Sequence, residues 1–302
     1  MTSPTMTDDE LIALFDRCSN TGRWGPDDEL GTLNYITDDT RAAAAALVTH
    51  GRSVSIGRDL STVADQLNTD PLRHRMLFDA TPPTSALDSI ELATHGFAVT
   101  HLDAVTHVFW DGNAYNGRRA EHLMRPDGLR AGSIYAQRHG IFTRGVLLDI
   151  TAVRGVTYLD PGDVVTAADL TAAEHLAGTT ITRGDAVFVH VGLERREAEH
   201  GTENPAVRAG LHADCLPWLH DREVAVYSGD CVEQIPYPSA TVPLPLHQIG
   251  LVAMGLVLLD CPRLTDLVEI STELSTAQFL LTVAPLRIPG ATGCPVNPLC
   301  LF

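Results

Sequence analysis

The sequence has no Cys-x-x-Cys pair, no cluster of basic residues and no uninterrupted apolar run of about 18 residues, the length that a membrane-spanning helix needs. Its start, from Met1 to Glu10, is polar and acidic and lacks the basic and apolar regions of an export signal. We therefore expect a soluble, cytoplasmic protein that does not enter a membrane.

Six cysteines are scattered along the 302 residues, at positions 18, 215, 231, 261, 294 and 300. A chain of this length buries enough apolar surface to fold without covalent cross-links. The even count would also suit three disulfides, but such frameworks belong mainly to exported proteins. We interpret the six cysteines as free thiols.

Acidic residues outnumber basic residues by 38 to 21, which gives a formal net charge of −17. A surface of this charge repels a phosphate backbone, and no local group of lysines or arginines offsets the repulsion. The composition therefore argues against nucleic acid as a partner.

No shift in composition marks a domain boundary. The 24 glycines and 18 prolines are spread over the whole length rather than gathered into a linker. We therefore expect a single domain over residues 1–302, with a helical N-terminal region over residues 1–50.

Two helices are predicted in that N-terminal region. Thr7-Asp-Asp-Glu10 has the pattern of a capping box, and apolar residues follow at helical spacing, so a helix is expected to end before Gly22. The alanine-rich stretch 39–46 predicts a second helix, which stops at Gly51.

Short apolar or β-branched runs, each bounded by glycine, proline or charge, predict strands further along the chain. These runs are 53–56, 145–150, 186–191, 224–228 and 279–283, and helices are predicted over 169–177, 206–220 and 247–254. The helices are too unevenly placed for regular βαβ alternation. We therefore expect an α+β fold with a largely buried mixed sheet flanked by helices.

The segment 94–112 contains His95, His101 and His107 together with Asp103. If residues 99–109 are extended, His101, Asp103 and His107 lie on one face, with about 6.6 Å between alternate residues. Imidazole and carboxylate suit zinc, manganese or iron, and two of these side chains could hold one ion. The alternative is that the histidines are ordinary hydrogen-bonding residues beside a turn.

The motif Thr100-His-Leu-Asp-Ala-x-x-His107-x-Phe109 resembles the signature of the cyclase superfamily, which includes bacterial kynurenine formamidases and isatin hydrolases. The resemblance covers nearly the whole chain. It continues, toward the longer members of the family, through the segments 23–34, 115–117, 216–220 and 247–255.

This resemblance implies a swivelling β/β/α-like fold and a divalent metal, zinc or manganese. It implies His101, Asp103, His247 and Asp260 as metal ligands and His107 as proton donor and acceptor. The later carboxylate is usually a glutamate in the family, whereas this chain has Asp260. The resemblance also implies a homodimer or homotetramer.

The chain departs from the family pattern at Phe97, where the family has a histidine ligand. His95 could replace it only if the chain bends sharply, because six extended residues would separate His95 from His101 by about 20 Å. Gly96 makes such a bend possible. With one imidazole missing, we expect one ion per chain.

These features predict a metal-dependent hydrolase that cleaves an amide, imide, lactam or ester bond of a small cyclic or aromatic molecule, with His107 as general acid and base. One alternative is a metal-dependent cyclase or dehydratase. A second alternative is a non-catalytic metal or ligand binder, although such a protein would not need a proton shuttle.

Four aromatic residues are candidates for a substrate pocket, with burial in the core as the alternative. They are Trp24, Phe97, Trp110 and Tyr115. Asp230, which follows the predicted strand 224–228 and a glycine, could contact the site or cap a turn.

Overall fold

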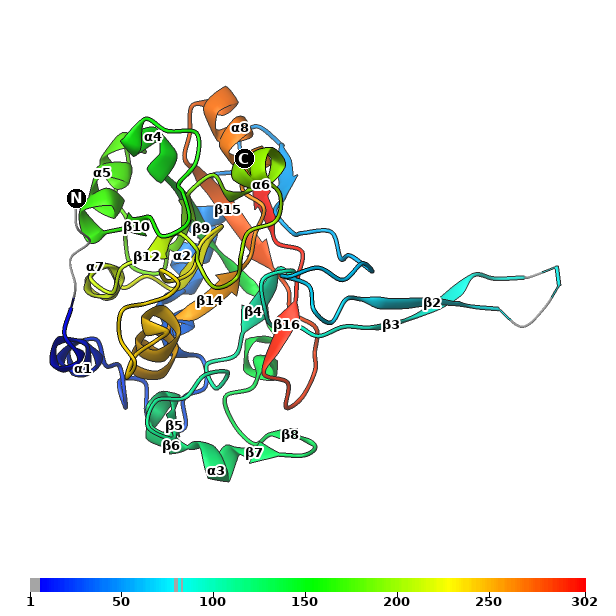
Figure 1. Ribbon diagram of the computed structural model, residues 1–302, viewed down its shortest axis with the longest axis horizontal. Helices are drawn as coiled ribbons and strands as arrows, with labels where there is room; N and C mark the ends of the chain where they lie inside the picture. The colour runs from blue at the N-terminus through cyan, green and yellow to red at the C-terminus, as the bar shows by residue number, and fades with distance from the viewer. Residues whose placement is uncertain (1–5, 79–80, 83) are drawn as a thin grey trace.

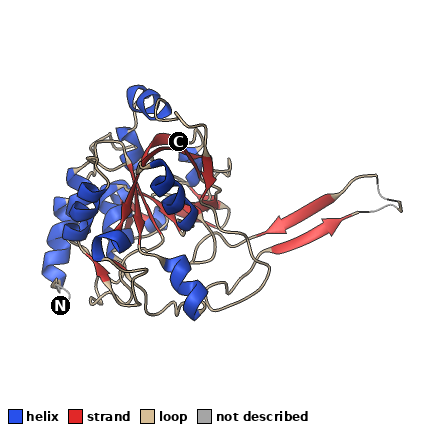
Figure 2. Ribbon diagram, turned by 90° about the horizontal axis from the view of Figure 1, so that it is seen from above, coloured by secondary structure: helices blue, strands red, loops and turns tan. Residues whose placement is uncertain are grey.

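The computed structural model describes residues 6–78, 81–82 and 84–302. Its centre is a curled nine-stranded mixed sheet with helices packed around it, and a long two-stranded arm projects from one side (Figure 1, Figure 2). The predicted α+β class, with a mixed sheet flanked by helices, is confirmed.

All helices of the described residues are short, at ten residues or fewer. They are α1 (Asp8–Arg17), η1 (Gly31–Tyr35), α2 (Asp38–Ala45), η2 (Tyr115–Gly117), α3 (Ala120–Leu123), η3 (Ile134–Gln137), α4 (Ile150–Arg154), α5 (Ala167–Leu176), α6 (Leu193–His200), α7 (Cys215–Asp221), the π-helix η4 (Leu246–Met254) and α8 (Thr265–Leu274).

The main sheet contains β1 (Ser53–Ser55), β4 (His101–Asp103), β9 (Ile141–Asp149), β11 (Ala186–His190), β13 (Val226–Gly229), β14 (Val257–Asp260), β15 (Gln278–Val283), β16 (Gly293–Pro295) and β17 (Leu299–Leu301). Four two-stranded pairs accompany it. They are formed by β2 (Arg73–Leu77) with β3 (Leu87–Glu91), β5 (Asn113–Ala114) with β6 (Arg118–Arg119), β7 (Met124–Arg125) with β8 (Gly128–Leu129), and β10 (Val164–Val165) with β12 (Gly210–Leu211).

The strand order in the main sheet is β1-β17-β15-β9-β11-β13-β14-β4-β16. Strands β9, β11, β13 and β14 are parallel, so their carboxyl ends share one edge. Strand β4 pairs antiparallel with β14, and Asp260 lies opposite His101 in this pairing. Two residues from distant parts of the chain therefore meet at the carboxyl end of a central parallel strand, where α/β proteins commonly bind ligands.

The central strands are buried on both faces, which explains why they read as continuous apolar runs. In β11, Val187 and Val189 belong to one hydrophobic cluster, whereas Ala186 and Phe188 belong to a second cluster on the opposite face. The sheet therefore divides the core in two and gives the polar residues at its edge a rigid support.

The helix predicted over 206–220 is wrong in its first half. There the chain forms β12, which pairs with β10, and the helix begins only at Cys215. Gly210 explains the difference, because a Cβ at this position would stand 2.4 Å from the backbone of Glu233. This close approach of two backbones is a tertiary constraint that overrides local helix propensity.

The arm formed by β2 and β3 extends away from the sheet (Figure 1, Figure 2). Cross-strand ion pairs link Arg73 with Glu91 and His74 with Asp88. The arm also carries exposed apolar side chains, which are Met76, Phe78, Leu87 and Ile90. A two-stranded ribbon that packs against nothing is marginally stable in water.

All six cysteines are free and buried, as the sequence predicts. Among the described residues, no helix combines the length and the apolar character that crossing a membrane requires.

Candidate metal centre

His101 and Asp103 project from the same short strand, β4, and both are almost completely buried. Nδ1 of His101 lies 2.7 Å from the carbonyl oxygen of Val99. Because a carbonyl can only accept a hydrogen bond, Nδ1 carries the proton and the lone pair of Nε2 is free. That Nε2 lies 3.5 Å from Oδ1 of Asp103.

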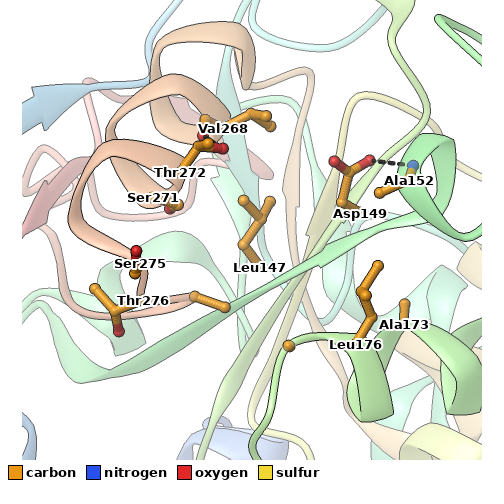
Figure 3. A pocket seen from close by; sticks show the side chains of 12 residues that line it. Leu147, Asp149, Ala152, Ala173, Leu176, Val268, Ser271, Thr272, Ser275 and Thr276 are labelled. Atoms are coloured by element: carbon orange, nitrogen blue, oxygen red, sulfur yellow. Dashed lines mark hydrogen bonds between the residues drawn. The ribbon is translucent and has the colours of Figure 1, made fainter.

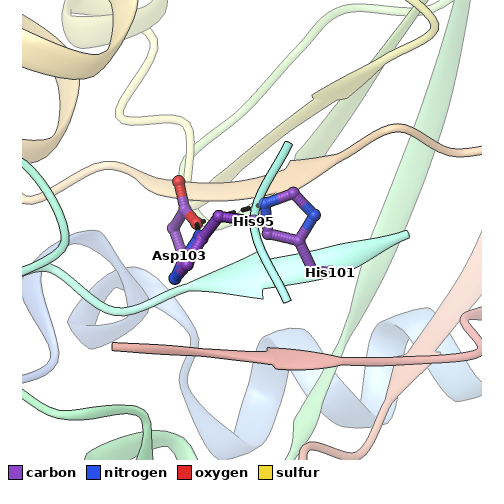
Figure 4. Close-up of side chains that lie close together, drawn as sticks. All are labelled: His95, His101 and Asp103. Carbon is purple, nitrogen blue, oxygen red and sulfur yellow. Dashed lines mark ion pairs between the residues drawn. The ribbon is translucent and has the colours of Figure 1, made fainter. Parts of the chain in front are cut away.

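His95 lies beside the same carboxylate, so the chain makes the sharp bend that a ligand at this position required and does not hold His95 at the extended distance of about 20 Å from His101. The chain bends over residues 95–99, and Gly96 adopts a φ of +116° that side-chain-bearing residues rarely take. Nδ1 of His95 lies 3.1 Å from Oδ1 of Asp103 (Figure 4). The bend thus supplies an imidazole that position 97 lacks.

His247 and Asp260 approach Asp103 from the other side. His247 stands in the first turn of η4, and Asp260 ends β14. Nε2 of His247 lies 3.2 Å from Oδ2 of Asp260 and 3.8 Å from Oδ2 of Asp103.

The five side chains form two overlapping groups that share Asp103. One group is His95, His101 and Asp103, and the other is Asp103, His247 and Asp260; within each, the potential ligand atoms lie within 4.8 Å of one another. Oδ1 of Asp103 faces the first group and Oδ2 faces the second. Asp103 could therefore offer one carboxylate oxygen to a metal ion in each of the two groups.

Unsatisfied atoms in this cluster fit a cation. Both oxygens of Asp103 and Oδ1 of Asp260 are buried without a hydrogen-bond partner. Burying such groups unpaired is costly, and a divalent ion between them removes the cost. The nitrogen and oxygen donors suit zinc, manganese or iron.

Glu233, which the sequence analysis missed, orients His247. Both of its carboxylate oxygens lie 3.0 Å from Nδ1 of His247, and Oε2 also accepts a hydrogen bond from the backbone N–H of His247. Carboxylates commonly hold the distal nitrogen of a ligating histidine in this way. Glu233 belongs to no motif, so only its place in the fold reveals it.

The charges of the cluster shift its pKa values in opposite directions. Burial lowers the pKa of His247, but Glu233 and Asp260 raise it by more, and the result is well above the ordinary value. Burial raises the pKa of Asp103, but the contact with His95 and the other imidazoles lower it by more. The site therefore favours an ionised carboxylate and positive charge beside it.

His107 reaches the cluster through a turn rather than an extended strand. Strand β4 ends at Asp103, and the N–H of His107 donates to the carbonyl of Ala104. The condition that residues 99–109 are extended is therefore met over His101–Asp103 but not as far as His107. Its ring stacks on that of His95, with centroids 3.6 Å apart. Burial lowers the pKa of His107 to about 4. It therefore presents a neutral imidazole at the edge of the cluster.

Two of the four aromatic pocket candidates, Tyr115 and Trp24, belong to or pack against the hydrophobic cluster that contains Phe188. Tyr115 is buried, and its hydroxyl donates to Asp28. Trp24 packs edge-to-face against Tyr35, with ring centroids 5.1 Å apart. Both side chains have structural contacts that account for their size.

The other two candidates lie on the opposite side of the core. Trp110 stacks at a tilt on Phe15 of α1, with centroids 4.8 Å apart. Phe97 lies under the guanidinium group of Arg208 and lines two cavities. None of the candidate metal ligands is among the described residues that line them.

Asp230 caps α6. Its two oxygens accept hydrogen bonds from the backbone N–H groups of Val191, Gly192 and Leu193. The capping alternative from the sequence analysis accounts for all of these contacts.

A cavity of about 320 Å³ between α5 and α8 lies apart from these residues (Figure 3). Asp149 is the one ionisable side chain among the described residues that line it. Its carboxylate is already engaged by the backbone N–H of Ala152, the hydroxyl of Thr151 and the ring of His190. The hydroxyl of Ser271, which also lines the cavity, is buried without a hydrogen-bond partner, but none of the candidate metal ligands lines this cavity.

The comparison with protein families matches residues 35–233 to the Cyclase family, described as "Putative cyclase". The match spans more than half of the chain and includes the motif from His95 to His107. The protein belongs to this family. No curated protein matches the sequence.

Solved structures share the fold. A structure described as a novel cyclase superposes with a TM-score of 0.84 at 26% identity and covers 94% of this chain and 99% of its own. Isatin hydrolase A from Labrenzia aggregata, bound to benzyl benzoate, gives 0.60 at 17% identity, with 86% and 96% covered. A predicted metal-dependent hydrolase from Bacillus stearothermophilus gives 0.52 at 14% identity, with 83% and 98% covered.

Glu233→Gln should weaken metal binding about 10- to 100-fold, because the amide loses the charge that orients and polarises His247. Competition with a chromogenic chelator measures the affinity, and circular dichroism checks the fold. The matched control is Glu121→Gln, at an exposed position, which should bind metal as the wild type does. Equal affinities for the three proteins would contradict the orienting role.

Proposed function

We propose that this protein is a metal-dependent hydrolase that cleaves an amide, imide, lactam or ester bond of a small cyclic or aromatic molecule. The observation that carries the proposal is the buried group of five nitrogen and oxygen donors with unsatisfied carboxylate oxygens. Membership of the Cyclase family supports it.

Divalent ions held by His95, His101, Asp103, His247 and Asp260 would act as Lewis acids toward water and a carbonyl group. A side chain of the protein, that of His107, would carry the proton. His107 stands beside His95 with a neutral imidazole, so it can take a proton from the attacking water and return it to the leaving nitrogen or oxygen. Glu233 keeps His247 in the orientation that ligation needs.

The names of the structural relatives support hydrolysis, because they include isatin hydrolases and a predicted metal-dependent hydrolase. The relative at 26% identity is described as a cyclase, which favours ring closure or dehydration as the second candidate. The two reactions differ in whether water is consumed or released.

His107→Ala should lower kcat by about 10² to 10⁴ while metal stays bound, because a general acid and base is lost and no ligand is removed. A panel of cyclic amides and N-formyl aromatic amines, assayed with and without chelator, supplies the substrate, and elemental analysis gives the metal content. His122→Ala is the matched control, since His122 is exposed. Loss of metal from His107→Ala would make His107 a ligand instead.

We expected a single ion because Phe97 stands where the family has a histidine ligand. The imidazole of His95, 3.1 Å from Asp103, could take the place of that ligand. We propose instead that the chain binds two ions: His95, His101 and Asp103 would hold one, and Asp103, His247 and Asp260 would hold the other. Shared carboxylates are common between metals about 4 Å apart.

Elemental analysis should therefore find about two ions per chain in the wild type, about one in His95→Ala and almost none in Asp103→Ala, since Asp103 serves both groups. Phe97→Ala, which leaves all five ligands in place, is the control. One ion in the wild type, lost equally in His95→Ala and Asp103→Ala, would restore a mononuclear centre.

The arm supports the expected homodimer or homotetramer. Its exposed apolar side chains lie on a ribbon that needs packing to be stable, and closed homo-oligomers are the commonest assemblies. We propose that the arm packs against a second copy of the chain.

Leu87→Ser combined with Ile90→Ser should shift the mass from an oligomer toward the 32.5 kDa of one chain, because apolar contact area is lost. Light scattering coupled to size exclusion measures the mass. Leu176→Ser, on α5 and similarly exposed, should leave the mass unchanged. A monomeric wild type would refute the proposal.

A further inference from the structure

A small cavity is lined by two arginines and by residues that neighbour the candidate ligands in the chain. Phe97 and Cys261, which lie close to the candidate ligands in the chain, form its walls together with Arg58 and Arg208. Its volume is about 10 Å³, which is room for about one water-sized group. A larger cavity of about 360 Å³ shares Arg58 and Phe97 with it.

The two cavities together describe a site for a small molecule. The larger volume lies in the usual range for small ligands, roughly 300 to 1,000 Å³. Arg58 and Phe97 line both cavities, so a ligand in the larger cavity lies against two of the side chains that form the walls of the smaller one.

Arg208 has unused hydrogen-bonding capacity in this cavity. Its side chain is 5% exposed, and both Nε and Nη1 are buried without a hydrogen-bond partner. Its guanidinium carbon lies 4.5 Å from the centre of the Phe97 ring, which fixes the plane of the group. Donors buried in this way are costly unless a ligand or water accepts from them.

Glu203 does not neutralise the charge around Arg208. Its carboxylate lies 3.4 Å from Nη1 of Arg208 and 3.6 Å from Nη1 of Arg196, so one carboxylate faces two guanidinium groups. Burial raises the pKa of Glu203 despite both arginines. These three side chains together carry one net positive charge, and the carboxylates of Glu197 and Asp230 also act on Glu203.

The other charged groups around the cavity are already engaged. Asp230 accepts three backbone N–H groups at the start of α6. Arg58 donates from Nε to the carbonyl of Cys261, and its Nη1 lies 3.7 Å from Glu197. Among the described residues that line the cavity, the unsatisfied side-chain atoms are the two donors of Arg208.

We propose that Arg208, assisted by Arg58, binds a carboxylate group of the substrate. The proposed hydrolase would then act on a small carboxylic acid that presents its amide or ester bond to the metal centre. The nature of the cleaved bond rests on the proposed function, whereas the anion site does not.

A carboxylate fits this place better than a phosphate does. Its two coplanar oxygens match two N–H groups of a guanidinium fork, and one oxygen fills the water-sized cavity. The three free oxygens of a phosphate would need more room. Phe97 is the aromatic side chain among the described residues that line the larger cavity, which is also lined by the carboxylates of Asp59, Asp65, Glu194 and Glu197.

Isothermal titration with benzoate and with its neutral isostere benzamide tests the site directly. The wild type should bind benzoate about 10- to 100-fold more tightly, the usual effect of charge-assisted hydrogen bonds. Arg208→Gln should remove this preference and Arg58→Gln should reduce it. Arg41→Gln, at an exposed position on α2, is the matched control and should keep it.

The titrations are made on the protein as purified and again after chelation, because a bound metal could also attract benzoate. Binding by the metal would persist in Arg208→Gln and disappear with chelator, and this result would overturn the proposal. Equal binding of benzoate and benzamide by the wild type would also overturn it. If Arg208→Gln does not fold, the reduced preference of Arg58→Gln for benzoate over benzamide tests the same site.

Turnover separates this inference from the proposed function. The hydrolase should prefer 4-formamidobenzoate over 4-formamidobenzamide by about tenfold in kcat/KM, through KM, and Arg208→Gln should abolish the preference. If neither compound nor any other panel member is hydrolysed while benzoate binding still depends on Arg208, the anion site stands and the hydrolase proposal fails. Hydrolysis without a carboxylate preference would instead support the hydrolase proposal and overturn the substrate carboxylate.

Discussion

The buried carboxylate of Asp103 is the group on which the rest of the centre depends. It is completely buried, and neither of its oxygens accepts a hydrogen bond. Burying an ionised carboxylate without a partner raises the free energy of the folded state by roughly several kcal/mol. Three imidazoles approach it to between 3.1 and 3.8 Å, each from a different part of the fold. The bend at Gly96, strand β4 and helix η4 all serve to place positive or metal-binding groups around this one charge.

A residue of this centre can be predicted from the sequence when a pattern of nearby residues or the family motif marks it, and not when only a contact between distant segments does. His101 and Asp103 were identifiable because alternate residues of a strand share a face, and His247 and Asp260 because the family resemblance extends to them. His95 was set aside on a distance that holds only for an extended chain, and one glycine with positive φ reverses it. Glu233 gave no signal, since a carboxylate that acts on a histidine 14 residues away is recognisable only in space.

The same distinction applies to the fold. The strands at 145–150, 186–191, 224–228 and 279–283 were predictable, because burial on both faces leaves a plain apolar signature. The pairing of β14 with β4 was not, because antiparallel partners so far apart in the chain share no sequence pattern. The helix predicted at 206–220 failed for a related reason: its apolar spacing looks helical, but contact with the backbone of Glu233 decides the structure at Gly210.

The distribution of charge affects ligand binding both at the metal centre and at the cavity lined by Arg58 and Arg208. A chain with a net charge of −17 repels anions at long range, so an anionic substrate would gain little from steering in solution. Inside the protein the balance differs, because Arg208 and Arg196 share one carboxylate and the ions proposed at Asp103 would add further positive charge. In a water-poor cavity these charges act over short distances with little screening. An anion would therefore be bound favourably only after it has entered the cavity. Discrimination between substrates would then depend on contacts inside the cavity rather than on long-range attraction at the protein surface.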